Sequence, residues 1–147
     1  MANPSPQGNP ETKGGLKSPI EIIKTSGQRE TPGSDPIALV RQVDFLVQKG
    51  VVKLLQLGNT VFVIYPQPNG TAEFHTFTIE DPQTLVQRYK VAARSLKQMG
   101  FKKAVSFASS PAFVKMAKAT GLPVKISHDV QKYGNKARQA YKFEIDL

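Results

Sequence analysis

Three segments with the residue pattern of β-strands follow one another between residues 51 and 79, with no room for a helix between them. The first two, VVKLLQL at 51–57 and TVFVIY at 60–65, are rich in β-branched residues and flank Gly58-Asn59, a pair typical of hairpin turns. The third, at 71–79, follows the turn sequence PQPNG. Strands joined by such short turns pair with their neighbours, so the sequence predicts a three-stranded antiparallel meander.

Helices are predicted on both sides of the meander by a repeated signal. An Asp-Pro pair stands at 35–36 and again at 81–82, so each helix is expected to begin with an aspartate N-cap followed by a proline. The helices are expected to end at Gly50 and Gly100. The second helix is the longer, and its apolar stripe predicts the face that covers a sheet: Leu85, Tyr89, Ala92, Leu96 and Met99.

The rest of the chain alternates strand and helix patterns. We expect a strand at 103–108, a third helix from Ser109-Ser110-Pro111 through Thr120, and two last strands at 124–130 and 139–145. A basic, glycine-containing loop at 132–138 is expected between those strands. Because the long helix must cross to a neighbouring strand of the same sheet, this order predicts an α/β domain over 35–147, with a mixed, largely antiparallel sheet of about six strands flanked by three helices.

Residues 1–34 differ in composition, since prolines recur among Gly, Ser, Gln and Lys. Such a segment buries too little apolar area to offset the entropy of ordering, so we expect an extended or disordered N-terminal arm. Its apolar cluster contains Leu16, Ile20, Ile22 and Ile23, and the even spacing of the first three suits an extended segment added to the sheet of another chain. We therefore predict that these four residues bind a partner subunit. The alternative is a linker in which the isoleucines are incidental.

The formal net charge of +9 predicts a basic surface. No acidic residue stands between Pro82 and His128, whereas basic residues recur throughout that stretch. The predicted basic surface comprises the outer face of the long helix and the loop before the last strand, with Lys90, Arg94, Lys97, Lys132, Lys136 and Arg138. Such a surface attracts nucleic acid or an acidic protein face, and both alternatives stay open.

The sequence contains no cysteine and two histidines, which excludes a disulfide framework, a thiol nucleophile and thiolate metal sites. No metal or cofactor is expected. There is no apolar run of about eighteen residues or more, and the N-terminal residues lack the pattern of a secretory signal, so we expect no membrane contact. These features fit a cytoplasmic protein or a component of a particle that meets both reducing and oxidising surroundings.

The helix that ends at Gly100, the strand KAVSFA and the segment SSPAFVKMAKATGLP, in this order after the meander, resemble the C-terminal two thirds of the GNAT acetyltransferase superfamily. The resemblance covers residues 35–147 and implies a glycine-containing loop, before the long helix, that binds the pyrophosphate of acetyl-CoA. Here EDPQTL stands at 80–85: it has no glycine, places two carboxylates at the phosphate position and loses one N–H donor at Pro82. We expect this junction to cap its own helix instead of binding the cofactor.

The resemblance also implies an asparagine at the entry to the next helix and a tyrosine that protonates the leaving thiolate. Ser110 and Ala117 stand at those positions. A candidate base remains in Glu73 and His75, which share one strand face at i, i+2 spacing, and the alternative is a solvated strand face. Other catalytic or phosphate-binding motifs are absent from the sequence.

The leading hypothesis is therefore a non-catalytic assembly protein that docks to neighbouring subunits, in multiple copies, through its N-terminal arm and its basic surface. It is similar in this respect to acetyltransferase-like virion proteins of tailed phages, which implies a head, connector or internal component of a bacteriophage particle. Two alternatives stay open: a divergent acetyl-CoA-dependent N-acyltransferase, and a basic accessory protein that binds nucleic acid.

Overall fold

The computed structural model describes residues 15–30, 35–133 and 136–147. The helices of these residues are α1 (Pro19–Glu30), α2 (Pro36–Gln48), α3 (Pro82–Gln98) and α4 (Ala112–Ala119). The strands are β1 (Lys53–Leu57), β2 (Thr60–Gln67), β3 (Thr71–Thr78), β4 (Lys103–Ala108), β5 (Val124–Tyr133) and β6 (Lys136–Asp146), and the 3-10 turn η1 (Pro68–Gly70) joins β2 to β3. The strands and the three helices predicted within 35–147 are thus confirmed, with small shifts of their ends.

The strands form one mixed sheet in the order β1-β2-β3-β4-β6-β5. The predicted meander is confirmed, because β1 pairs antiparallel with β2 and β2 pairs antiparallel with β3. Helix α3 then crosses to β4, which lies parallel to β3. The remaining two pairs, β4 with β6 and β6 with β5, are antiparallel. The predicted α/β fold class is confirmed.

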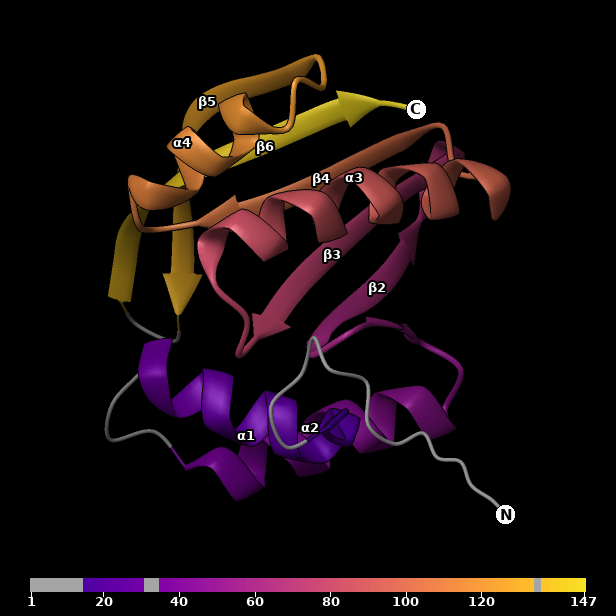
Figure 1. Ribbon diagram of the computed structural model, residues 1–147, viewed down its shortest axis with the longest axis vertical. Helices are drawn as coiled ribbons and strands as arrows, with labels where there is room; N and C mark the ends of the chain where they lie inside the picture. The colour runs from indigo at the N-terminus through magenta and orange to yellow at the C-terminus, as the bar shows by residue number, and fades with distance from the viewer. Residues whose placement is uncertain (1–14, 31–34, 134–135) are drawn as a thin grey trace.

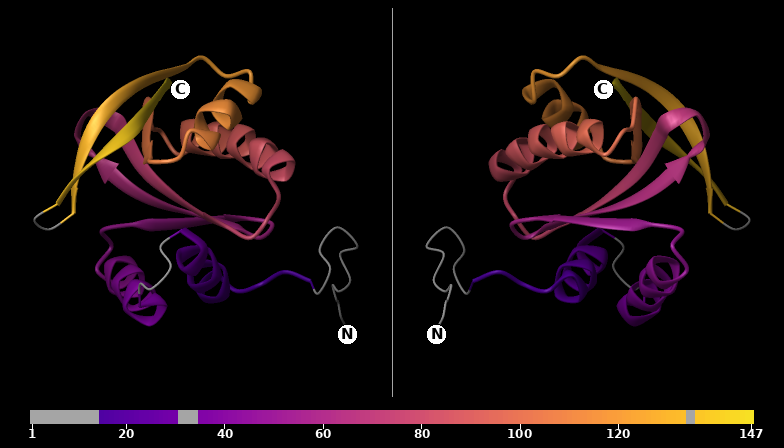
Figure 2. Two further views of the ribbon diagram at one scale, coloured as in Figure 1. Left: turned by 90° about the vertical axis from the view of Figure 1, so that its left-hand side faces the viewer. Right: turned by 90° about the vertical axis from the view of Figure 1, so that its right-hand side faces the viewer.

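Helices cover both faces of the sheet, as Figures 1 and 2 show: α1 and α2 lie on one face, and α3 and α4 lie on the other. Strand β2 serves both faces because side chains alternate along a strand. Val61 and Val63 pack in the cluster under α1 and α2, whereas Phe62 and Ile64 pack in the cluster under α3. The residues Val61 through Ile64 are all buried. The core therefore consists of two apolar layers that share one strand.

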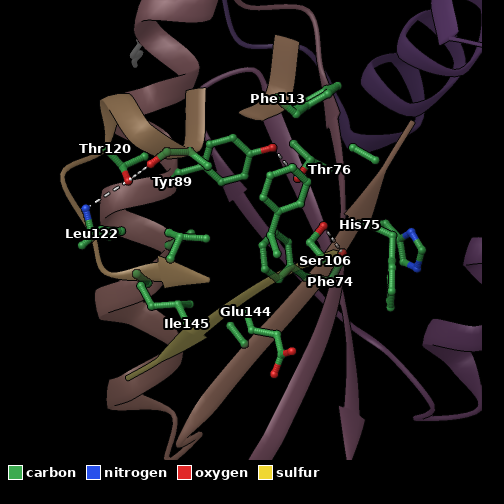
Figure 3. A pocket seen from close by; sticks show the side chains of 18 of the residues that line it. Phe74, His75, Thr76, Tyr89, Ser106, Phe113, Thr120, Leu122, Glu144 and Ile145 are labelled. Atoms are coloured by element: carbon green, nitrogen blue, oxygen red, sulfur yellow. Dashed lines mark hydrogen bonds between the residues drawn. The ribbon is translucent and has the colours of Figure 1, made fainter. Parts of the chain in front are cut away.

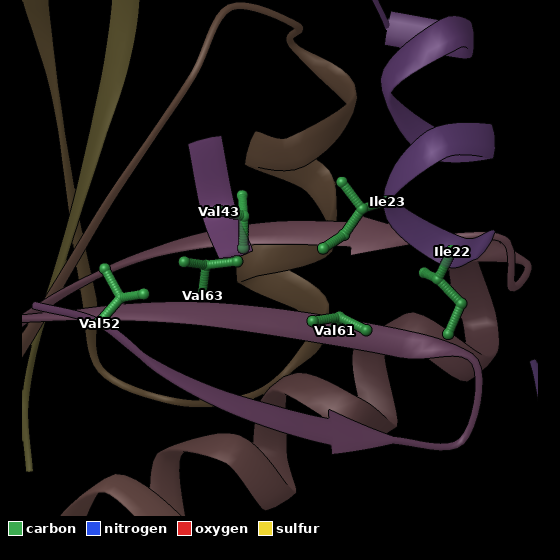
Figure 4. Close-up of a cluster of buried hydrophobic side chains, with 6 residues drawn as sticks. All are labelled: Ile22, Ile23, Val43, Val52, Val61 and Val63. Atoms are coloured by element: carbon green, nitrogen blue, oxygen red, sulfur yellow. The ribbon is translucent and has the colours of Figure 1, made fainter. Parts of the chain in front are cut away.

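The extended conformation predicted for the N-terminal arm is wrong over residues 19–30, which form helix α1. Ile22 and Ile23 of α1 are 0% and 2% exposed and pack against the valines of the sheet (Figure 4). These two residues therefore belong to the core of the chain itself, which corrects their predicted place in a partner-binding surface. Leu16 and Ile20 are exposed, and partner binding by them stays a prediction. The other parts of the predicted arm, residues 1–14 and 31–34, lie outside the described residues.

Tertiary contacts explain why α1 is helical despite a sequence with Thr, Ser and Gly in its interior. Gly27 lies directly under α2, since a Cβ atom at this position would stand 2.8 Å from Leu39 Cδ2. Ser26 is buried, and its Oγ accepts a hydrogen bond from the backbone N–H of Thr78 (3.1 Å). The small residues thus allow close approach to α2 and to the sheet, and packing stabilises a helix that has weak propensity.

The predicted loop at 132–138 is also shorter than expected. Strands β5 and β6 continue to the pairs Gln131–Arg138, Lys132–Ala137 and Tyr133–Lys136, so only residues 134–135 separate them. Cross-strand hydrogen bonding extends the hairpin through residues whose side chains carry no strand pattern. Within the part of the chain that the structure describes, no helix is long and apolar enough to cross a membrane.

Candidate functional site

Strands β3 and β4 pair over a short length and then part. In these two strands the ladder consists of Thr71–Lys103, Ala72–Ala104 and Glu73–Val105, although β3 continues to Thr78 and β4 to Ala108. The first carbonyl beyond the ladder, that of Phe74, accepts a hydrogen bond from the side-chain hydroxyl of Ser106 (3.0 Å) instead of from a backbone N–H. The two strands therefore diverge from this point.

A cleft of about 590 Å³ occupies the space between the diverging strands, with α3 and α4 as its outer walls (Figure 3). Its lining is mainly apolar and aromatic, with a few hydroxyl groups, the imidazole of His75 and the carboxylate of Glu144. Residues that represent each wall are Phe74 and Thr76 of β3, Tyr89 and Ala93 of α3, Ser106 of β4, Phe113 and Ala117 of α4, and Phe143 of β6. An apolar cleft with a few convergent polar groups has the character of a small-molecule site.

The cleft reaches between the strands as well as under the helices. Consecutive residues of β3, from Phe74 to Phe77, line it, although their side chains alternate between the two sheet faces. Beyond the ladder, β3 is paired only with β2, and β4 is paired only with β6. Two open strand edges thus face each other across the cleft, and their backbone N–H and C=O groups are free of sheet pairing on that side.

Tyr89 of α3 packs against β2 and β3 inside the cleft. Its Oη donates a hydrogen bond to Thr76 Oγ1 (3.1 Å), and its ring makes edge contacts with Phe62 at a centroid distance of 5.6 Å. Figure 3 shows the Tyr89 ring turned into the cleft beside Phe74. The stripe on α3 that contains Tyr89 was predicted to cover the sheet, which is confirmed for Leu85, Ala92 and Leu96, while Tyr89 also lines the cleft.

The predicted pair Glu73 and His75 meets on the side of β3 that bears α1 and α2. Glu73 Oε2 lies 3.2 Å from His75 Nε2, and both side chains are partly exposed. The ring of Tyr65 contacts the imidazole edge-on at 5.3 Å. Burial, followed by the negative charge of Glu73, raises the pKa of the Tyr65 phenol, so this hydroxyl stays protonated at neutral pH. His75 also lines the cleft and lies at its margin in Figure 3.

The junction before α3 caps the helix as predicted. Asp81 Oδ1 accepts a hydrogen bond from the backbone N–H of Thr84 (2.8 Å), and Pro82 occupies the first turn. This backbone bond is the main cause of the lowered pKa of Asp81. Next to it, Glu80 accepts two hydrogen bonds from Arg88, at 2.9 and 2.8 Å, and one from Thr60 Oγ1 at 2.7 Å. Both carboxylates at this junction are therefore occupied by the protein itself.

The other residues singled out in the sequence lie in different parts of the molecule. Lys90, Arg94 and Lys97 are exposed on α3 as predicted, whereas the side chains of Lys132, Lys136 and Arg138 lie outside the described residues. Ser110 Oγ accepts a hydrogen bond from the N–H of Ala112 at the start of α4, and Ala117 lines the cleft. Among the described residues, no group of three or more His, Asp and Glu side chains could hold a metal ion.

Sequence reasoning missed the cleft itself and most of its lining. Phe74, Phe113 and Phe143 look like ordinary core residues in the sequence. Ser106, the uncharged polar residue within the strand KAVSFA, is the one local signal, because a hydroxyl in a buried strand needs a partner. The divergence of β3 and β4 depends on contacts between distant segments, so periodicity within either strand does not show it.

No family model matches the sequence, and no curated protein matches it. Solved structures with a similar fold include a spermidine N-acetyltransferase variant from Vibrio cholerae, with 10% identity and a TM-score of 0.64 over 86% of this chain and 89% of that one. An acetyltransferase from Bacillus subtilis in complex with CoA has 16% identity and a TM-score of 0.59, with 90% and 95% covered. The IAA acetyltransferase from Bacillus cereus has 17% identity and a TM-score of 0.54, with 88% and 96% covered. The chain therefore has the fold of the GNAT acetyltransferases.

Proposed function

We propose that this protein transfers an acyl group from a thioester to an amine, and that the cleft between β3 and β4 binds the thioester. The observation that carries the proposal is the pair of open strand edges across an apolar cleft. Such edges bind an extended chain that contains amides, as in strand addition. Acyl-pantetheine is a chain of this kind, since it has amide groups along its length and ends in the thioester.

The proteins of similar fold support this choice of chemistry. The Bacillus subtilis acetyltransferase is in complex with CoA, whose reactive end is pantetheine, and the Vibrio cholerae protein is a spermidine N-acetyltransferase. Identity to this chain is low, so the support comes from the shared fold and from the cleft, and it does not specify the amine.

His75 is the proposed general base. Its contact with Glu73 favours the tautomer with hydrogen on Nε2, which leaves the lone pair of Nδ1 free to accept a proton. An amine that approaches from the α1–α2 side of the sheet would meet His75 at the margin of the cleft. The amine nitrogen attacks the thioester carbonyl carbon, the new C–N bond replaces the C–S bond, and the proton of the amine passes to His75.

Tyr89 is the proposed hydrogen-bond donor to the leaving thiolate. Its hydroxyl lies in the cleft and donates to Thr76, so rotation of the hydroxyl hydrogen would direct it to a sulfur atom nearby. In this role Tyr89 replaces the tyrosine that the family resemblance implies at the position of Ala117.

The second candidate is the non-catalytic assembly role. Two observations favour it: the carboxylates of Glu80 and Asp81 stand at the start of α3, and Ala117 carries no proton donor. Negative charge at a helix N-terminus opposes the binding of a phosphate group. In this case the cleft would bind no acyl donor.

Release of thiol from S-acetyl pantetheine in the presence of polyamines and lysine peptides tests the proposal. The protein contains no cysteine, so a thiol reagent detects the product without background from the protein. We expect turnover, a loss on the order of a hundredfold in kcat/KM for His75→Gln, and a smaller loss in kcat for Tyr89→Phe, which keeps the ring contacts.

Ala117→Phe fills the cleft and should abolish binding of the thioester, whereas Ala119→Phe, on the exposed side of α4, should leave binding unchanged. Absence of binding and turnover in the wild-type protein would favour the assembly role.

A further inference from the structure

The cleft and the junction before α3 differ in the ligand chemistry that they favour. The cleft suits a long chain with amides, but the start of α3 already holds two carboxylates. Asp81 occupies the N–H of Thr84, and Glu80 is fixed by Arg88 and Thr60. The family resemblance implies that the pyrophosphate of acetyl-CoA binds at this junction, so a donor whose chain ends in a diphosphate would meet these charges. A donor that brings the same chain without a diphosphate avoids them.

The basic residues of α3 lie on the flank that faces α4. Successive residues of a helix are about 100° apart, so Lys90, Arg94 and Lys97 fall on one side of the cleft-lining Tyr89 and Arg88 falls on the other. Arg88 pairs with Glu80. The pair lies beside the β1–β2 turn, since a Cβ atom added to Gly58 in that turn would contact the Arg88 guanidinium. The basic row therefore lies on the exposed flank of α3 that is away from that turn, and Figure 1 shows α4 on the side of α3 opposite to β2.

Helix α4, the opposite wall of the cleft, is also basic. Lys115 and Lys118 are exposed on it, and Lys125 is exposed at the start of β5. Within the described residues, none of these lysines and none of the three basic residues on α3 forms an ion pair. Both walls of the cleft thus carry unpaired positive charge, and no acidic residue from 83 to 127 offsets it. The carboxylate of Glu144, which lines the cleft on β6, is already paired with Lys103 and Lys142.

From this arrangement we propose that the acyl donor is an acidic carrier protein, whose phosphopantetheine arm enters the cleft while its acidic surface lies against α3 and α4. This proposal rests on the proposed function and specifies its donor. The arm of a carrier protein is joined to a serine through a single phosphodiester, so no diphosphate has to lie at the start of α3. The basic flanks complement the acidic surface of the carrier and increase the rate of association.

The observations favour a protein partner over nucleic acid. A nucleic acid backbone would neutralise the basic flanks but would leave the apolar cleft between them empty. Aromatic side chains that line the cleft, such as Phe74 and Tyr89, lie inside it, whereas stacking on bases requires exposed rings.

Comparison of three donors tests the proposal: S-acetyl pantetheine, acetyl-CoA and an acetylated bacterial acyl carrier protein, each with the same amine and the same thiol assay. We expect kcat/KM to be highest with the carrier protein, by on the order of tenfold or more over S-acetyl pantetheine. If S-acetyl pantetheine reacts and the carrier protein gives no gain, the carrier is excluded and the proposed function stands. If no donor reacts, the proposed function fails, and the carrier proposal fails with it.

Charge reversal locates the docking surface. The variant K90E/R94E/K97E should lower kcat/KM with the carrier protein by on the order of tenfold more than with S-acetyl pantetheine. The matched control K24E/R41E/K53E changes the net charge equally at exposed positions of α1, α2 and β1, and it should leave the ratio of the two rates unchanged. Equal effects of both variants would overturn the proposal. Loss of salt-dependent DNA binding in the first variant, with no change in the carrier-dependent rate, would assign the surface to nucleic acid and would also overturn it.

Discussion

At the scale of single residues, Glu80 connects strand β2 to helix α3 near the β1–β2 turn. Its carboxylate accepts hydrogen bonds from Thr60 of β2 and from Arg88 of α3, and its side chain is 9% exposed. Burial, the largest single influence, raises the pKa of Glu80, but the bonds from Arg88, Thr60 and the backbone of Asn59 outweigh it. The pKa of Glu80 thus lies below its ordinary value of 4.5. The ionised form stabilises the fold above that value.

We predict that Glu80→Gln lowers the free energy of unfolding by about 1–3 kcal/mol at neutral pH, because Arg88 loses a charged partner. The wild-type protein should lose this stabilisation as the pH falls below the ordinary value of 4.5 and through the lowered pKa of Glu80, and the variant should show a smaller loss. Urea unfolding across this range measures both effects. Equal pH dependence in the two proteins would contradict the assignment, and the double variant E80Q/R88Q gives the coupling energy of the pair.

A second prediction concerns Gly58 in the β1–β2 turn. Its φ is +59°, and a Cβ atom there would collide with Arg88 and lie 2.7 Å from Glu80 Oε2. Gly50 has a φ of +73° with nothing within 4 Å of a Cβ atom, so Gly50→Ala carries the backbone strain alone, about 1–2 kcal/mol. Gly58→Ala should cost more than Gly50→Ala in urea unfolding. Equal losses in the free energy of unfolding would show that the Glu80 and Arg88 side chains can move away from a Cβ atom at position 58 without loss of stability.

At the scale of elements, α1 shows how tertiary contacts give a helix to a segment of weak propensity. Residues Gly15 to Ser18 run beside the β1–β2 turn, where Lys17 N–H donates to Asn59 Oδ1 (2.8 Å) and its carbonyl accepts from Gln56 Nε2 (2.9 Å). Helix α1 then buries Ile22 and Ile23 against the sheet. Ile22 and Ile23, which were predicted to bind a partner subunit, therefore complete the apolar layer between the sheet of this chain and its helices α1 and α2.

We predict that Ile22→Ala destabilises the protein by about 2–5 kcal/mol, because it leaves a cavity between α1 and the sheet. Ile20→Ala in the same helix should change stability by no more than about 0.5 kcal/mol, since Ile20 is 55% exposed. Thermal or urea unfolding measures both variants. If the two substitutions have the same small effect, α1 does not pack on its own sheet in solution. Leu16, Ile20, Ile22 and Ile23 would then all be available to bind a partner subunit, as predicted from the sequence.

At the scale of the whole molecule, β2 ties the two apolar layers together. Its residues alternate between the α1–α2 layer and the α3 layer, and each layer contains buried side chains from β2 and from at least one helix. Neither layer can open without exposing one face of this strand. The packing therefore favours a single cooperative unfolding unit.

We predict that Val63→Ala, in the first layer, and Phe62→Ala, in the second, both lower the midpoint of one common calorimetric transition. Far-ultraviolet circular dichroism and the calorimetric signal should coincide for each variant. Two separate transitions in the Val63→Ala variant would show that the α1–α2 layer unfolds by itself.

Local patterns in the sequence predicted the meander, the helices from 35–36 and 81–82, the Asp81 cap and the mixed sheet, because short turns, N-caps and side-chain periodicity act between near neighbours. They also predicted that Glu73 and His75 share a strand face. Helix α1, the extended hairpin of β5 and β6, and the cleft were decided by the tertiary structure. Each depends on contacts between distant segments: Gly27 under Leu39, Tyr133 opposite Lys136, and Ser106 at the carbonyl of Phe74. Such contacts form only when the whole sheet is assembled, and for that reason the sequence by itself determined the framework while the fold decided where a ligand can bind.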